Sequence, residues 1–282
     1  MSQIKGANVL VTGGANGLGK LFGQKCLQEG AANLIIWDIN DENLEKTKNE
    51  FSTKGYQNVT TYVVDVSSVN DIEKNATKVL LDVGTIDILY NNAGIVPGNK
   101  SFWEHTAKDI EKTININLTG VMNVTRVFIQ DMINRGKGHI VNIASASSFI
   151  PLPKGSVYAS SKWAVLGWSE SLRMELEMEG KDLHVTTICP SYIDTGMFKG
   201  VKAPTLFPLL KPDDVINITN KAIKKNEHLF LMPENLYVVP ALKGIIPSKL
   251  FDKAASWLGV YSSMNSFEGR PEKERVPEKK VK

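Results

Sequence analysis

The strongest constraint on the fold is a glycine-rich turn that joins a short apolar run to a helical pattern near the start of the chain. Residues 7–12, ANVLVT, are apolar and β-branched, and they run through GGANGLG into the helical pattern LGKLFGQKCLQEG. A strand, a glycine turn and a helix in this order form the phosphate-binding unit of dinucleotide-binding folds. Gly13, Gly17 and Gly19 would permit the tight turn, close approach to a pyrophosphate and close helix packing. Glycine spacing alone is a weak signal, so the rest of the chain must support it.

Strand-like and helical segments alternate along most of the chain. Apolar runs lie at 33–37, 59–64, 86–90, 139–143, 185–189 and 228–232, and helical patterns at 42–54, 69–83, 108–135, 155–176 and 213–224. This order predicts an α/β protein with a single-domain Rossmann fold, a doubly wound parallel sheet with helices on both faces. We expect this domain over 1–232, with a substrate lid at about 196–212, an apolar C-terminal helical extension over 233–267 and a charged, disordered tail over 268–282.

Composition excludes several other classes of protein. With 42% hydrophobic and 22% charged residues the chain is typical of a globular domain, and its net charge of +3 is too small and too scattered to predict a nucleic-acid partner. Cys26 and Cys189 lie in apolar segments, as reduced core thiols do, and no ligand spacing predicts a metal site. Neither a secretory signal peptide nor a membrane-spanning run is evident, which makes the cytosol the simplest expectation.

An acidic residue follows the second predicted strand. Asp38 comes about twenty residues after the glycines, where a carboxylate can accept hydrogen bonds from both hydroxyls of an adenosine ribose and would repel a 2′-phosphate. Ala15, Asn16, Ile39 and Asn40 offer no positive charge nearby. The sequence therefore predicts NAD in preference to NADP, while a plain turn or helix-capping role for Asp38 remains the alternative.

Tyr158 and Lys162 stand four residues apart on the predicted helix 155–176, so their side chains should lie on one face. A nearby ammonium favours the phenolate, and we expect it to lower the pKa of Tyr158 from about 10. Such a tyrosine could serve as a proton acid or base. Taken alone, such a pair is more often ordinary helix surface, with the tyrosine at the margin of the core and the lysine in solvent.

Together these motifs resemble the classical short-chain dehydrogenase/reductase family over roughly residues 4–232. The resemblance rests on Thr12–Gly19, Asp38, Asp65-Val66, the NNAG at 91–94, Asn117 within NLTG, and Ser145 thirteen positions before Tyr158. Within that family, the chain looks closest to lipid-droplet-type 17β-hydroxysteroid dehydrogenases and epidermal retinol dehydrogenases, on the segments LIIWDIN, GHIVNIAS, TGMF and LFLMP. Those relatives carry an N-terminal membrane anchor, which we do not expect here. After the predicted strand 185–189 the family usually has Pro-Gly, whereas this chain has Pro190 followed by Ser191.

The resemblance implies a set of functional residues. Tyr158 would be the acid/base, Lys162 would lower its pKa and hold the nicotinamide ribose, Ser145 would orient the substrate oxygen, and Asn117 would hold a water that relays protons. The cofactor-binding residues implied are Thr12, Gly13, Asn16, Gly17, Leu18, Gly19, Asp38, Asp65, Val66, Asn91, Asn92, Ala93, Gly94, Tyr158, Lys162, Pro190, Ile193 and Thr195. A homodimer or homotetramer is also implied.

Apolar residues after Ser145 and after Thr195 predict an apolar substrate pocket, with Ser145, Phe149, Tyr158, Met197 and Phe198 as substrate contacts. The expected function is NAD-dependent interconversion of a hydrophobic alcohol (a steroid, a retinoid or a long-chain alcohol) and its carbonyl. A dehydrogenase of a small polar alcohol and a non-catalytic NAD-binding sensor or scaffold are the alternatives. Residues 236–260, apolar with several lysines, are also a candidate for peripheral contact with a membrane or lipid droplet.

Overall fold

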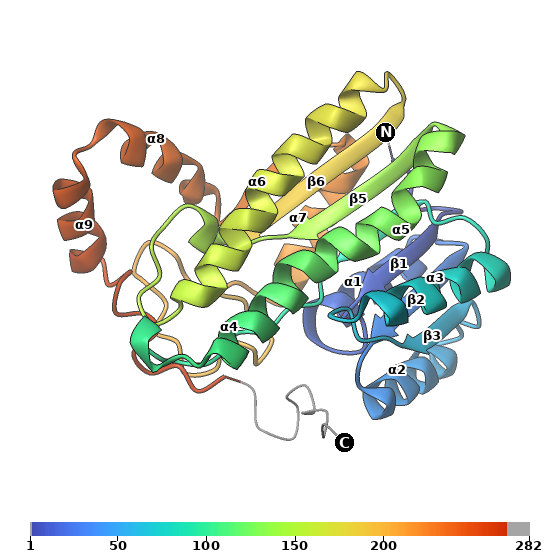
Figure 1. Cartoon of the computed structure of the whole chain (residues 1–282), viewed down its shortest axis with the longest axis horizontal. Helices are drawn as coiled ribbons and strands as arrows, with labels where there is room; N and C mark the ends of the chain where they lie inside the picture. Colours follow the sequence, from blue (N-terminus) through green and yellow to red (C-terminus); the bar gives the residue numbers. More distant parts are fainter. Residues whose placement is uncertain (1, 270–282) are drawn as a thin grey trace.

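The computed structural model describes residues 2–269 and contains a seven-stranded parallel sheet between two layers of helices (Figure 1). The strand order is β3-β2-β1-β4-β5-β6-β7. The bounds are β1 (Asn8–Thr12), β2 (Asn33–Asp38), β3 (Val59–Val63), β4 (Ile88–Asn91), β5 (Lys137–Ile143), β6 (Asp182–Pro190) and β7 (Leu229–Met232). The prediction of a doubly wound Rossmann fold is confirmed. The reversal of strand order at β1 and β4 is where such sheets bind ligands.

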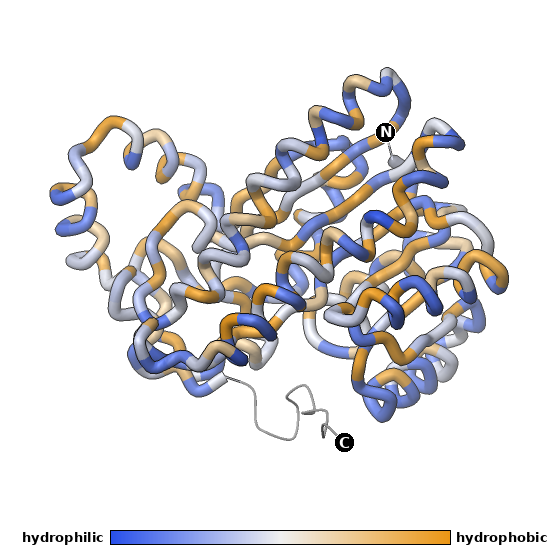
Figure 2. The backbone as a smooth tube through the Cα atoms, viewed as in Figure 1, coloured by the Kyte–Doolittle hydropathy of each residue, from blue (hydrophilic) through white to orange (hydrophobic). Residues whose placement is uncertain are grey.

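Helices cover both faces of the sheet because successive strand residues point to opposite sides. On β1, Val9 and Val11 pack on one side, and Leu10 packs on the other. The first side is covered by α1 (Gly17–Gln28), α2 (Asp41–Thr53) and α7 (Pro212–Lys225), and the second by α3 (Val69–Asp82), α5 (Gly120–Arg135) and α6 (Ser156–Met178). Figure 2 accordingly shows the central strands as largely hydrophobic between helices of mixed character.

The helix predicted over 108–135 is interrupted. It consists of α4 (Ala107–Ile114), a π-helical turn over Asn115–Thr119, and α5. Such wide turns are often found at functional sites. The side chain of Asn117, which lies in this turn, is directed to the chain after β4, where it pairs with both backbone groups of Ile95. This tertiary contact accounts for an asparagine inside a helical run.

The C-terminal extension is helical, with α8 (Val238–Ile245) and α9 (Ser248–Trp257) after a short 3₁₀ turn, Glu234–Tyr237. Leu236, Val239, Ala255 and Val260 pack with residues at the carboxyl ends of β5 and β6 in a third hydrophobic cluster. Of the predicted tail, residues 270–282 lie outside the described part. Among residues 2–269, we find no helix with the length and apolar character needed to span a membrane.

The segment predicted as a lid, 196–212, lies against the chain that follows α9. The Lys202 amide donates to the Ser263 carbonyl at 3.1 Å, and the Glu268 amide donates to the Lys199 carbonyl at 2.9 Å. Phe207, within the lid, is buried. The lid and residues 263–269 therefore form one wall at the carboxyl end of the sheet.

Candidate active site

The glycine turn brings three backbone segments into close contact. Gly13 has φ +63°, and a Cβ added there would lie 2.9 Å from the Cα of Ala93. A Cβ at Gly19 would lie only 2.5 Å from the Gly13 carbonyl oxygen. Thr12 Oγ1 accepts from the amides of Asn92 and Ala93 at 3.1 Å each, which fixes the loop after β1 to the loop after β4. This cradle, at the N-terminus of α1, suits the pyrophosphate of a dinucleotide.

Asp38 closes one end of the cleft that begins at this turn. Its Oδ2 accepts from the Ala15 amide and its Oδ1 from the Asn40 amide, both at 3.1 Å. These contacts orient the carboxylate at the end of β2 and tie it to the glycine loop. The capping role that the sequence left open belongs instead to Asn40, whose side chain accepts from Asn43 at the start of α2.

The cleft, which is open to solvent, spans about 1130 Å³ and is lined by most of the residues predicted to bind a cofactor. Those that line it are Gly13, Asn16, Leu18, Asp38, Asp65, Val66, Asn92, Ala93, Gly94, Tyr158, Lys162, Pro190, Ile193 and Thr195. Thr12, Gly17, Gly19 and Asn91 are not part of the lining. Asn91 is buried and donates to Thr125 Oγ1 and Asn142 Oδ1, both at 2.9 Å.

Further lining residues were not predicted. They are Trp37, Ile39, Val64, Ile95, Ile116, Ile143, Ala144 and Ser191. Met197 and Phe198, which were predicted as substrate contacts, also line the cleft. Most are apolar neighbours of the motif residues at strand ends. The sequence did contain a signal for these residues, because they lie next to Asp38, Asp65, Gly94 and Ser145. The carboxyl ends of parallel strands converge, so the neighbours of motif residues at these ends should also line the cleft.

Tyr158 and Lys162 project from α6 into the other end of the cleft, 6% and 4% exposed respectively. Lys162 Nζ lies 5.9 Å from the centre of the Tyr158 ring and donates to the Ile143 carbonyl at 2.7 Å. Asn117 accepts from the Ile95 amide at 2.8 Å and donates to the Ile95 carbonyl at 2.9 Å. A Cβ added at Gly94 would lie 3.3 Å from Asn117 Oδ1 and 3.6 Å from Lys162 Nζ, so both side chains border the same glycine.

Burial dominates the protonation of this pair. Burial raises the pKa of Tyr158 to about 12, although a hydrogen bond from Ser145 favours the phenolate and acts to lower this pKa. Burial also lowers the pKa of Lys162 to about 8. The expectation that the pKa of Tyr158 lies below its usual value of about 10 is therefore wrong for this structure, because burial outweighs the other influences.

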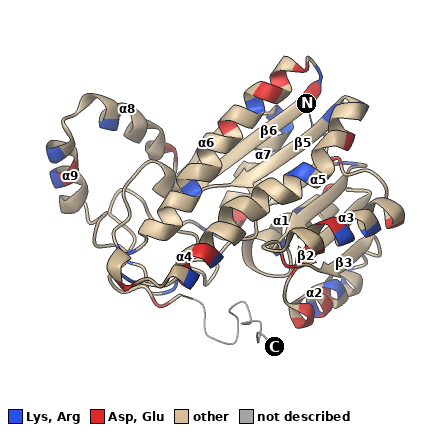
Figure 3. Cartoon of the chain, in the orientation of Figure 1, with Lys and Arg blue, Asp and Glu red and all other residues tan. Residues whose placement is uncertain are grey.

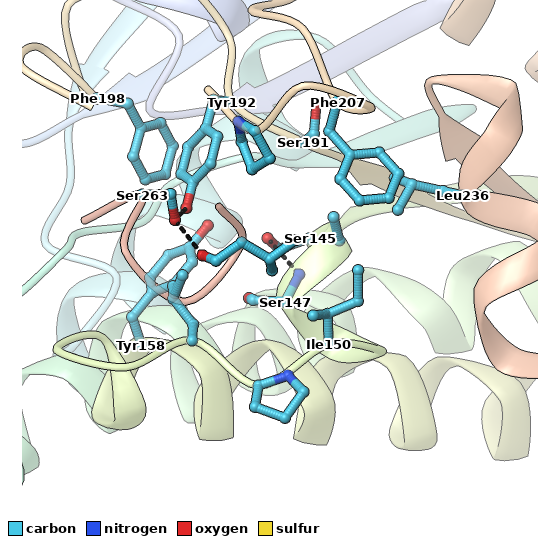
Figure 4. A pocket seen from close by; sticks show the side chains of 15 residues that line it. Ser145, Ser147, Ile150, Tyr158, Ser191, Tyr192, Phe198, Phe207, Leu236 and Ser263 are labelled. Atoms are coloured by element: carbon cyan, nitrogen blue, oxygen red, sulfur yellow. Dashed lines mark hydrogen bonds between the residues drawn. The ribbon is translucent and has the colours of Figure 1, made fainter. Parts of the chain in front are cut away.

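A second cavity, of about 500 Å³, adjoins the tyrosine (Figure 4). Its lining is mostly apolar: Ser145, Ala146, Ser147, Ile150, Pro151, Leu152, Tyr158, Ser191, Tyr192, Phe198, Pro204, Phe207, Leu236, Val260 and Ser263. Ser145 Oγ accepts from the Ser147 amide at 3.1 Å, and Tyr192 shares a 2.7 Å hydrogen bond with Ser263.

Three of the five predicted substrate contacts, Ser145, Tyr158 and Phe198, line this cavity. Met197 lines the cleft instead. Phe149 lines neither space: its side chain packs on the third hydrophobic cluster, and its carbonyl accepts from Lys243 Nζ at 3.2 Å. Leu236, Val260 and Ser263 were missed because they come from the C-terminal extension, which local sequence spacing does not connect to Tyr158.

The cleft and the cavity meet at three residues, Tyr158, Ser191 and Phe198, which line both. A ligand in each space would therefore have the Tyr158 phenol at the junction, where it can give or take a proton. A dinucleotide cleft that ends at a buried tyrosine in the wall of an apolar cavity defines a Rossmann-type oxidoreductase site.

The chain belongs to the short-chain dehydrogenase family, whose pattern it matches over residues 7–205. It is 34% identical to mouse epidermal retinol dehydrogenase 2 over 96% of this chain and 88% of that protein. Human short-chain dehydrogenase/reductase 3 is 32% identical over 93% and 87% of the two chains, and human estradiol 17-beta-dehydrogenase 11 is 32% identical over 88% and 81%. As a member of this family, the chain is a nicotinamide-dependent oxidoreductase that acts on CH–OH groups.

Solved structures agree with the fold. A short-chain dehydrogenase/reductase from Burkholderia phymatum in complex with NAD superimposes with a TM-score of 0.79 at 24% identity, covering 90% of this chain and 97% of that one. A putative short-chain dehydrogenase from Novosphingobium aromaticivorans gives a TM-score of 0.73 at 26% identity, covering 89% and 87%. The similarity extends over nearly the whole length of both bacterial chains.

Proposed function

We propose that the chain interconverts a hydrophobic alcohol and its carbonyl with NAD as cofactor and Tyr158 as acid/base. The observation that carries this proposal is the junction at Tyr158 between the dinucleotide cleft and a mostly apolar cavity. The names of two relatives, a retinol dehydrogenase and an estradiol dehydrogenase, agree with an apolar substrate. A steroid, a retinoid or a long-chain alcohol is therefore favoured over a small polar alcohol.

The chain's own residues would divide the chemistry as follows. Tyr158 would take the proton of the substrate hydroxyl in oxidation and return it to the carbonyl in reduction, while Ser145 orients the reacting oxygen. The nicotinamide, when bound, supplies the hydride acceptor or donor. Lys162 would hold the ribose, and Asn117 Oδ1, beside it at Gly94, would hold the water that relays protons to solvent.

Activity is tested by NADH absorbance with NAD and a panel of alcohols: a steroid 17-alcohol, retinol, a long-chain secondary alcohol and a sugar alcohol. Turnover of one lipid-like alcohol, lost in Tyr158→Phe while NADH binding persists, is the expected result. The phenylalanine keeps the ring in place and removes only the proton-transferring oxygen. Turnover of the sugar alcohol alone would favour a small polar substrate. Cofactor binding without any turnover would favour a non-catalytic sensor or scaffold.

Preference for NAD over NADP is proposed on the position of Asp38. Its carboxylate is fixed by the Ala15 and Asn40 amides at the end of the cleft, where a 2′-phosphate would meet a like charge. Titration of NADH and NADPH by fluorescence should give tighter binding of NADH by roughly tenfold or more. Asp38→Ser should remove most of that difference, and equal affinities in the unmodified chain would overturn the proposal.

We also propose a homodimer or homotetramer formed through α4, α5 and α6. Trp163, Met174 and Met178 on α6 are exposed apolar side chains, as an interface requires. Light scattering coupled to gel filtration would decide it: a monomer at micromolar concentration would exclude the oligomer.

A further inference from the structure

The helices α8 and α9, residues 238–257, form an arm that extends away from the sheet and its covering helices (Figure 1). Only one side of each helix contacts the rest of the chain. Val239 on α8 and Phe251 and Ala255 on α9 pack into the third hydrophobic cluster. The remaining surface of the arm faces outward.

Each helix of the arm carries a second apolar stripe on that outward surface. Val238, Leu242 and Ile245 on α8 are all exposed and recur at spacings of four and three, and Leu250, Ala254 and Trp257 do the same on α9. Residues at these spacings lie on one helix face. Ile245 is 82% exposed and Trp257 86%. Exposure of this degree at large apolar side chains marks an interaction surface.

Lysines border the stripe on α9. In helical projection, Lys249 and Lys253 both lie along one side of this stripe, and neither forms an ion pair with any other residue between 2 and 269. Asp252, the acidic residue of this helix, accepts a hydrogen bond from the Tyr261 hydroxyl. Lys243, on α8, folds back over the Trp163 ring at 4.7 Å. The outward face of α9 is therefore apolar with a basic edge, as the lysines in Figure 3 indicate.

We propose that the arm docks on an anionic lipid surface. Leucine, isoleucine and tryptophan side chains enter the boundary between headgroups and acyl chains, while lysines at the edge reach the negative headgroups. A two-fold contact between arms of two copies fits less well, because it would bring Lys249 and Lys253 of both copies together. This charge pattern favours the lipid surface as the occupant.

The arm is joined to the substrate cavity at both ends. Leu236, two residues before α8, and Val260, three residues after α9, both line that cavity. Docking would thus hold the cavity wall at the lipid surface, from which an apolar alcohol could enter without crossing water. This step rests on the proposed function, since it concerns delivery of the same class of substrate.

Flotation of the full chain with vesicles tests docking. The chain should float with phosphatidylcholine vesicles that contain phosphatidylserine, and weakly or not at all with phosphatidylcholine alone. Replacing Leu250 and Trp257 with serine, or Lys249 and Lys253 with glutamate, should lower partitioning by about tenfold or more. A matched control, Leu81→Ser with Trp103→Ser, changes the same residue types at 81% and 84% exposure elsewhere and should float like the unmodified chain.

Unchanged flotation of both arm variants, or no flotation of the unmodified chain, would overturn the proposal. Loss of flotation in the control variant would also overturn it. The proposal would fail as well if the chain did not bind vesicles but formed a dimer, measured by light scattering, that only the arm variants abolished. Kinetics separate docking from catalysis. With a long-chain alcohol in vesicles, the serine variant should show a higher KM at similar kcat, while a short soluble alcohol should be turned over unchanged. Flotation without turnover of any alcohol would instead refute the proposed function alone.

Discussion

Lys162→Met is expected to raise the stability of the chain while abolishing turnover. Lys162 is almost completely buried, and within residues 2–269 no carboxylate lies within ion-pair distance of its Nζ. Burial lowers its pKa from 10.5 to about 8. At ~1.4 kcal/mol per pKa unit, holding the ammonium in the native site costs roughly 3 kcal/mol at pH 7. Methionine removes this cost and keeps the side-chain volume.

The gain should be smaller than that cost. The variant loses the 2.7 Å hydrogen bond to the Ile143 carbonyl, which offsets roughly 1 kcal/mol. A net stabilisation of about 2 kcal/mol remains, which corresponds to a rise in Tm of roughly 4 °C or more for a chain of this size. Urea denaturation followed by circular dichroism at pH 7 measures the difference in free energy of unfolding.

The pH dependence provides the stricter test. Between about pH 8 and pH 10.5 the unfolded chain keeps the Lys162 proton while the native chain loses it, so the unmodified chain gains stability relative to the variant as pH rises. The advantage of Lys162→Met should therefore shrink across this window and disappear above it. Lys181→Met, at an exposed lysine, should differ little from the unmodified chain at either pH. A variant less stable at pH 7, or an advantage independent of pH, would refute the reasoning.

Two further predictions concern the sheet and the glycine turn. Burial lowers the pKa of His139 from 6.5 to about 3, with His184 acting in the same direction and Asp182 against it, so stability should fall with pH below 6.5. About 2 kcal/mol should be lost through His139 between pH 7 and pH 5, a loss that His139→Gln should abolish in urea denaturation. Gly19→Ala should reduce NADH affinity more than tenfold and lower Tm, because its Cβ would lie 2.5 Å from a backbone oxygen. Gly167→Ala, in α6 with open space around it, should instead raise stability by about 0.5–1 kcal/mol. If the two variants bound NADH with equal affinity, the proposal that the glycine turn holds the pyrophosphate would be contradicted.

The parts of the fold that could be predicted are those in which local pattern and tertiary packing require the same residues. Val9, Leu10 and Val11 must be apolar because both faces of β1 are covered, so the buried run was visible in the sequence. Gly13 has a positive φ, and a Cβ at Gly19 would meet the Gly13 carbonyl, so the turn itself already requires both glycines. The i, i+4 spacing of Tyr158 and Lys162 correctly placed both side chains at the cleft.

Other features depend on contacts between distant segments. Asn117 lies in a π turn and pairs with Ile95, a residue that is distant in sequence, and spacing within the helix does not contain that information. The pKa of Tyr158 follows from its burial, which a two-residue motif does not report. Phe149 is adjacent to the predicted pocket in sequence and packs on the same hydrophobic cluster as Ile150, yet only Ile150 lines the cavity. Val260 and Ser263 enter the cavity wall only because the chain returns after α9.

Because the chain returns to the cavity after α9, the residues of the cleft and some residues of the cavity wall come from different parts of the sequence. The sheet is complete when β7 ends at Met232, and the residues that line the dinucleotide cleft, Tyr158 among them, all precede it. Leu236, Val260 and Ser263, which line part of the second cavity, all follow it. A chain built in this way can exchange its last segment for a different one and acquire a new substrate range without disturbing the reaction itself. Evolution can alter what is oxidised independently of how it is oxidised.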